Sequence, residues 1–146
     1  MIENWLMVGG LIEARLRDKM PELADVRQIV SLAAIEELTP AVPAALIMWD
    51  GDDITGTSGP GAAQVVRQRW IVVLAVRSAV MSNTGGGVIT EAGPLLSGMI
   101  KALSGWAPSG LMRPMVRVSG IKPGFFAGYG FYPLTYTTTL VARGGA

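Results

Sequence analysis

The sequence contains no cysteine and no histidine among its 146 residues. The absence of cysteine excludes disulfide bonds, thiolate metal sites and cysteine nucleophiles. The absence of histidine removes the most common general base and the most common transition-metal ligand. A catalytic or metal-binding function would therefore have to rest on carboxylates, lysines and hydroxyl groups alone.

Charge is also scarce, because charged residues make up only 16% of the chain and the formal net charge is +1. A chain so nearly neutral exerts no global electrostatic attraction on nucleic acid or anionic lipid. Half of the residues are hydrophobic, which is enough for one core, and we predict a single domain over residues 1–146. So little surface charge also favours a surface that other subunits cover.

Long apolar runs are missing as well. The longest strongly apolar run, residues 70–76, is far shorter than the roughly 18–20 residues that span a bilayer. We therefore expect no membrane partner.

Two segments have the hydrophobic period of an amphipathic helix. The first covers residues 5–20 and must end at Pro21, which cannot continue a helix. The second covers residues 90–106, with Thr90 as its N-cap and Pro94 early enough to be tolerated.

Five segments read as β-strands: residues 26–33, 44–49, 64–78, 115–121 and 132–143, although residues 33–38 fit a short helix equally well. The strand at 64–78 is apolar on both faces in its middle, so it is either central or covered by a second subunit. In the last strand Thr135, Thr137 and Thr139 alternate with apolar residues, which predicts one wet face. We predict an α+β fold: a mixed, mainly antiparallel sheet of four to five strands packed against two main helices.

Residues 50–64 read DGDDITGTSGPGAAQ, a composition that predicts a long flexible loop. The three aspartates invite a calcium site. An EF-hand loop would then need polar, glycine and glutamate residues where Ile54, Thr55 and Gly61 stand. All three positions fail, so we predict no metal site.

The sequence supports neither phosphate binding nor nucleophilic catalysis. Residues 85–87 are three glycines between a predicted strand and a predicted helix, where phosphate cradles occur. Val88 and Ile89 follow them, whereas a phosphate-binding loop needs lysine and then serine or threonine. The lysines lie in no motif that would activate a serine. We therefore predict no catalytic residue, no cofactor and no enzymatic activity.

Four arginines, Arg67, Arg69, Arg113 and Arg117, fall on predicted strands, and Trp70 stands beside two of them. Arginine next to an aromatic residue is typical of nucleic-acid binding, and a small nucleic-acid-binding module is one alternative. The near-zero net charge and the lack of an RNA-binding aromatic pattern argue against sequence-specific binding. Pairing with carboxylates, across strands or across a subunit boundary, is the interpretation we favour.

Four segments together resemble the phage tail terminator (tail completion) proteins: TPAVPAALIMWDGDD, QVVRQRWIVVLAVRS, EAGPLLSGMIKALSGW and FYPLTYTTTLVAR. They form a proline-led strand that ends in a polar turn, an arginine- and tryptophan-containing strand, a helix with an apolar stripe, and a threonine-rich terminal strand. The resemblance extends over nearly the whole chain. The sequence departs from the family in its apolar, glycine-rich stretch at residues 125–132.

The resemblance implies a structural protein of the virion tail that is assembled in the bacterial cytoplasm. It would form a ring, typically a hexamer, that caps the tail tube, stops tube polymerisation and forms the interface to the head. The implied partners are other copies of the chain, the tail tube protein and head–tail connector proteins. A head–tail connector or joining protein is the alternative, because such proteins have similar sizes and compositions.

The charged residues supply a hypothesis for the contacts in such an assembly. Opposite charges lie on the predicted loop and on a strand that is apolar on both faces. We predict that the subunit or tube interface involves Asp50, Asp52, Asp53, Arg67, Arg69 and Arg117. In particular, Asp52 and Asp53 would meet Arg67, Arg69 or Arg117 of a neighbouring copy.

Overall fold

The computed structural model describes residues 2–77, 86–126 and 128–145. In chain order the elements are α1 (Met7–Lys19), β1 (Asp25–Gln28), the 3-10 turn η1 (Leu32–Ala34), α2 (Ile35–Leu38), β2 (Ala44–Ser58), β3 (Ala63–Arg77), α3 (Gly86–Leu103), β4 (Val116–Val118), β5 (Gly124–Phe126) and β6 (Tyr129–Arg143). The predicted α+β class is confirmed. The sheet has six strands rather than four or five, because the three-residue strand β5, which was not among the predicted strands, also pairs with β6.

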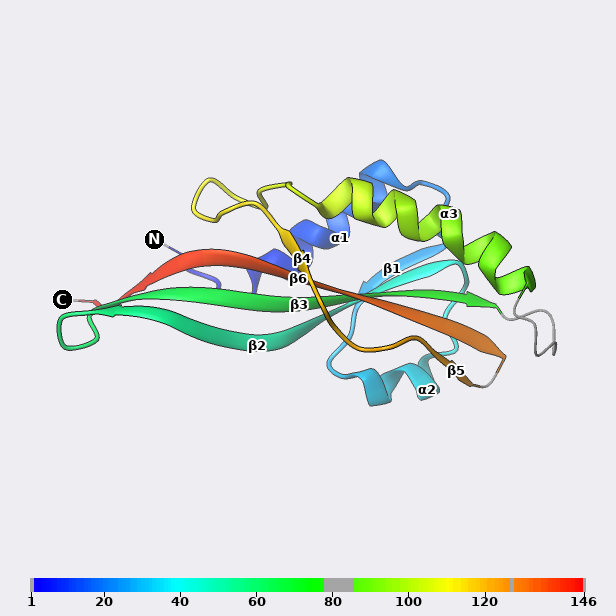
Figure 1. The fold of residues 1–146 in the computed structure, drawn as a ribbon, viewed down its shortest axis with the longest axis horizontal. Helices are drawn as coiled ribbons and strands as arrows, with labels where there is room; N and C mark the ends of the chain where they lie inside the picture. Colours follow the sequence, from blue (N-terminus) through cyan, green and yellow to red (C-terminus); the bar gives the residue numbers. More distant parts are fainter. Residues whose placement is uncertain (1, 78–85, 127, 146) are drawn as a thin grey trace.

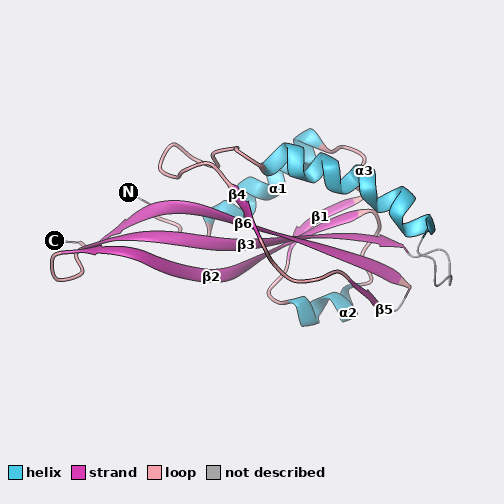
Figure 2. Ribbon diagram, viewed as in Figure 1, coloured by secondary structure: helices cyan, strands magenta, loops and turns pink. Residues whose placement is uncertain are grey.

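Three strands of 15 residues each, β2, β3 and β6, form the body of the sheet (Figure 2). The strand order is β1-β2-β3-β6-β4, and β5 pairs with the start of β6. Every pairing is antiparallel except that of β1 with β2. The predicted central position of the 64–78 strand is therefore confirmed as β3, which has a long partner on each side.

One face of the sheet packs under the two main helices, α1 and α3 (Figure 1). In α1 the spacing of Val8, Ile12 and Leu16 places all three on the sheet side, and each is fully buried. Met99 and Leu103 of α3 are fully buried in the same core. Burial of each such side chain contributes about 1.5–3 kcal/mol before the loss of conformational entropy is counted.

The opposite face holds a second, smaller core. Ile71, Val73 and Ala75 of β3 point to this side and are covered by η1, α2 and the start of β6. The glycine-rich stretch at residues 125–132 contributes here as the β5–β6 hairpin, which buries Tyr129 and Phe131. Two separate cores explain why β3 is apolar on both faces without a second subunit.

The predicted long loop at residues 50–64 is wrong. Strand β2 continues through Ser58 and β3 begins at Ala63, so a short turn rather than a long loop connects them (Figure 1). Turn-forming residues dominate this stretch, yet cross-strand pairing with β3 overrides their low strand propensity. The register shifts twice, between Trp49 and Asp52 and between Ile54 and Gly56, and these bulges accommodate the irregular sequence.

Two further predictions need correction. Helix α3 begins at Gly86 rather than Thr90, so Pro94 lies inside the helix and Thr90 is not its N-cap. Gly85 lies outside the described residues. The threonine face of β6 is not wet, because Thr135 is 5% and Thr137 is 6% exposed. The return of the chain after β4 places Gly120 directly against Thr135 and covers it.

The sheet extends well beyond the second core. Residues 52–58 of β2, 63–68 of β3 and 138–143 of β6 pair with one another and form a three-stranded extension, here called the arm. The β2–β3 turn and the end of β6 lie together at its tip (Figure 1). On the side away from α1 and α3, Val65 and Arg67 of the arm are exposed.

Candidate functional site

The acidic segment at the end of the apolar part of β2 forms a β-bulge. Trp49 lies opposite Trp70 and Asp52 opposite Gln68, so Asp50 and Gly51 occupy the extra length. Gly51 has a φ of +91°, a conformation that other residues rarely adopt. The bulge directs the carboxylates on its two sides toward different parts of the molecule.

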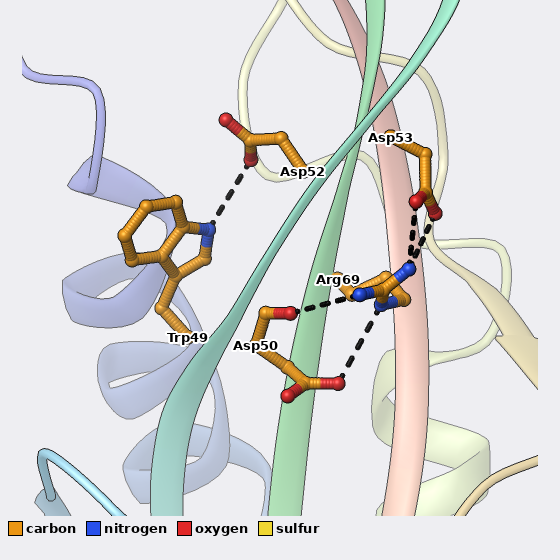
Figure 3. Close-up of polar contacts among 5 residues, drawn as sticks. All are labelled: Trp49, Asp50, Asp52, Asp53 and Arg69. Carbon is orange, nitrogen blue, oxygen red and sulfur yellow. Dashed lines mark hydrogen bonds and ion pairs between the residues drawn. The ribbon is translucent and has the colours of Figure 1, made fainter.

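Arg69 of β3 forms ion pairs with two of these carboxylates (Figure 3). Its Nη1 lies 2.8 Å and 2.6 Å from the two carboxylate oxygens of Asp53, and its Nε lies 3.5 Å from Oδ2 of Asp50. Its Nη2 also donates to the backbone oxygen of Asp50 at 3.1 Å. The hydrogen bond to Asp53, and then the charge of that carboxylate, raise the pKa of Arg69 above its ordinary value. Arg69 thus holds the bulge to β3.

Asp52 points to the helix-covered face and accepts hydrogen bonds from two indoles. Trp49 Nε1 donates to Oδ1 at 3.2 Å (Figure 3), and Trp5 Nε1 donates to Oδ2 at 2.8 Å. The role of the two tryptophans was not predicted from the sequence. An aspartate three residues after a tryptophan was the available signal, because a partly buried indole N–H usually finds an acceptor.

Arg67 and Arg117 do not join this cluster within one chain. Arg67 lies opposite Asp53 in the β2–β3 ladder, but it is exposed and forms no ion pair among the described residues. Arg117 lies on β4, opposite Tyr136, at the other edge of the sheet. The structure therefore brings together Asp50, Asp53 and Arg69. Contacts of the predicted residues with a neighbouring copy remain a prediction.

Both edges of the sheet are open toward the tip of the arm, over residues 52–58 of β2 and residues 141–143 of β6. The pairing of β1 with β2 ends at Ile47, and no described segment pairs with the outer edge of β2 after that residue. At the other edge, the chain before β4 follows β6 only as far as the bridge between Met112 and Leu140. Open strand edges carry unpaired backbone groups, which is typical of surfaces that contact another chain.

Within the described parts of the chain, no group of three or more carboxylates is arranged to hold a metal ion. A surface hollow of about 540 Å³ is lined by Ile2, Trp5, Leu111, Val141, Ala142 and Arg143. This lining contains neither a carboxylate nor a hydroxyl group. Within residues 2–77, 86–126 and 128–145, no helix is both long and apolar enough to cross a bilayer.

The fold and the cluster define an α+β protein whose polar groups tie strands together and whose sheet edges stay open. The family model for the Phage tail terminator protein matches residues 2–145, so the chain belongs to this family. Its role is structural, in the assembly of the phage tail, and it is a component of the virion tail. No curated protein matches the chain.

Proposed function

We propose that this protein is a ring-forming tail terminator, in which six copies form a closed ring on the end of the tail tube. The ring stops further addition of tube subunits and presents its other side to the head–tail connector. Its partners are copies of itself, the tube protein and connector proteins, and it assembles in the host cytoplasm. Membership of the terminator family supports the location at the end of the tail.

The observation that carries the proposal is the arm. A three-stranded sheet with two open edges and an uncovered face is unfavourable for an isolated subunit, because such edges pair readily with other chains. A closed ring covers the edges of every copy and leaves no growing end. A subunit of this kind can therefore terminate a polymer without any chemical step.

The proposal is tested by adding the purified protein to polymerising tail tube protein of the same phage. We expect the tubes to stop growing, and negative-stain electron microscopy to show a ring at one end. Native mass spectrometry of rings detached from the tubes should give the mass of six copies. Unchanged tube lengths with no density at either end would overturn the proposal, and binding to tailless heads instead would indicate a connector.

A further inference from the structure

The two open edges of the sheet carry opposite charge. The acidic edge, on β2, consists of Asp50, Asp52 and Asp53. The arginine edge consists of Arg113 in the segment before β4, Arg117 of β4 and Arg143 at the end of β6. Arg69 forms ion pairs with two of the three carboxylates at the acidic edge. The three arginines are exposed and form no ion pair with any described carboxylate. The arginine edge thus holds three cations without an ion-pair partner among the described residues, whereas one cation pairs with two of the three carboxylates of the acidic edge.

Asp53 of the acidic edge and Arg113 of the arginine edge lie at the same level along the strands. Asp53 is opposite Arg67 on β3, and Arg67 is opposite Thr139 on β6. The backbone N–H of Arg113 in turn donates to the Thr139 oxygen at 2.9 Å. A line across the sheet, perpendicular to the strands, therefore runs from Asp53 at one edge to Arg113 at the other.

Exposed apolar side chains accompany the charges on both edges. On the β2 side Trp49 is 40% and Ile54 is 53% exposed. On the other side Leu111, Val116 and Val141 are between 44% and 58% exposed. Aromatic residues and arginines are enriched at protein–protein interfaces relative to the remaining surface.

We infer that the acidic edge of one copy contacts the arginine edge of the next copy, side by side and at the same height. This interface rests on the proposed function, because it is the contact between neighbouring copies in the ring. Two different edges that meet make a head-to-tail contact, and such a contact closes into a ring when successive copies are rotated without a shift. The matching level of Asp53 and Arg113 along the strands favours such a contact over one with a shift.

Side chains, rather than a continuous backbone ladder, carry the contact. The two bulges in β2 interrupt the regular spacing of its outward-facing backbone groups. Bulges and charges on an edge strand suppress indiscriminate strand pairing. The carboxylates therefore select the arginine edge of another copy, and the apolar groups on either side are buried with them.

Cross-linking tests the geometry directly, because the natural chain has no cysteine. Ile54 lies opposite Val66, which lies opposite Leu140, and Leu140 bridges to Met112, the neighbour of Leu111. The double variant Ile54→Cys/Leu111→Cys is incubated with a short bismaleimide reagent, alone and with tail tubes. We expect a ladder of covalent multimers that ends at the ring size. Each single variant, as a matched control, should remain a monomer on a denaturing gel.

The possible outcomes separate this inference from the proposed function. Rings that form but yield no ladder from the double variant would overturn the inference and leave the proposed function intact. Dimers from either single variant would show a two-fold contact, which also overturns it. Failure to assemble, with or without tubes, would overturn the proposed function and the inference together.

Charge reversal supplies a second, independent measurement. Arg113→Glu and Arg117→Glu place negative charge on the arginine edge without breaking an ion pair within the described residues. We expect the concentration at which rings dissociate to rise about tenfold or more. Lys101→Glu, an exposed position on α3, is the matched control and should leave the dissociation concentration of the rings unchanged. An equal effect in all three variants, with unchanged circular dichroism, would contradict the inference.

Discussion

The indole Nε1 of Trp5 donates a hydrogen bond of 2.8 Å to Asp52, a residue 47 positions later in the chain. The backbone oxygen of Trp5 also accepts a 2.7 Å hydrogen bond from the side chain of Gln68, which is fully buried. The segment before α1 is therefore fastened to both β2 and β3. This attachment covers one face of the arm with a segment that contains no regular secondary structure.

Replacement of Asp52 by Asn tests this attachment. The charged acceptor of two indoles is lost, and we expect the free energy of unfolding to fall by about 1 kcal/mol. Hydrogen exchange of residues 2–6 should become faster, and tryptophan fluorescence should shift. Glu3→Gln, an exposed charge loss nearby, is the control and should change neither signal. Unaltered exchange in Asp52→Asn would show that the hydrogen bonds do not hold the segment.

The ion pair between Arg69 and Asp53 is half-exposed, with side-chain exposures of 36% and 43%, so its contribution should be modest. A double-mutant cycle with Arg69→Ala and Asp53→Ala should give a coupling energy of about 0.2–1 kcal/mol in urea unfolding. The coupling should shrink as salt is raised from 0.05 to about 1 M, because screening weakens exposed charges. The raised pKa of Arg69 adds stability that is lost only in strongly alkaline solution, so the coupling should not vary between pH 6 and about 9. A coupling of several kcal/mol would contradict this account.

Two adjacent glycines in α1 should respond to alanine in opposite directions. A Cβ at Gly9 would lie 2.3 Å from Gln28 Oε1 and 3.0 Å from Cζ3 of the buried Trp70, whereas a Cβ at Gly10 would meet nothing within 4 Å. Gly10→Ala should raise the free energy of unfolding by about 0.5–1 kcal/mol through helix propensity. Gly9→Ala should lower it by about 1–3 kcal/mol through overpacking. Thermal unfolding measures both, and equal stabilisation by the two variants would refute the close approach of α1 to the sheet.

Two buried threonines of β6 should also respond in opposite directions to valine. Thr138 donates a 2.7 Å hydrogen bond to the Arg113 backbone oxygen, while the buried Thr135 hydroxyl has no hydrogen-bond partner among the described residues. Thr138→Val should lower the free energy of unfolding by about 1–2 kcal/mol. Thr135→Val should leave it unchanged or raise it by up to about 1 kcal/mol, because an unsatisfied polar group is removed. Chemical denaturation distinguishes the two, and a large loss in Thr135→Val would indicate a partner for that hydroxyl.

Local pattern predicted the middle of the sheet better than its ends. In residues 70–76 of β3 every side chain is apolar, successive side chains point to opposite faces, and both faces are buried as expected. At residues 50–58 the glycines and aspartates favour turns, yet pairing with β3 keeps the chain extended through two bulges. The three-residue strand β5 has no period of its own, and only its partner β6 makes it a strand.

The same distinction applies to the predicted site residues: their charges are visible in the sequence, whereas their pairing depends on the fold. A cluster of aspartates and a set of arginines are visible in the sequence, because charge is a property of the residues themselves. That Arg69 pairs with Asp53 follows from the register of β2 and β3. That Arg117 stands at the far edge follows from the strand order, which inserts β6 between β3 and β4.

Composition and periodicity alone determined that this chain forms an α+β domain without cysteine or histidine chemistry, with two amphipathic helices and a central strand apolar on both faces. Those properties follow from interactions between residues close in sequence and from the burial of apolar surface. Tertiary structure decided that residues 50–58 extend the sheet. It also decided that the two edges carry opposite charge, with Asp53 and Arg113 at the same level along the strands. Both depend on hydrogen bonds between residues far apart in the chain, which no local pattern encodes.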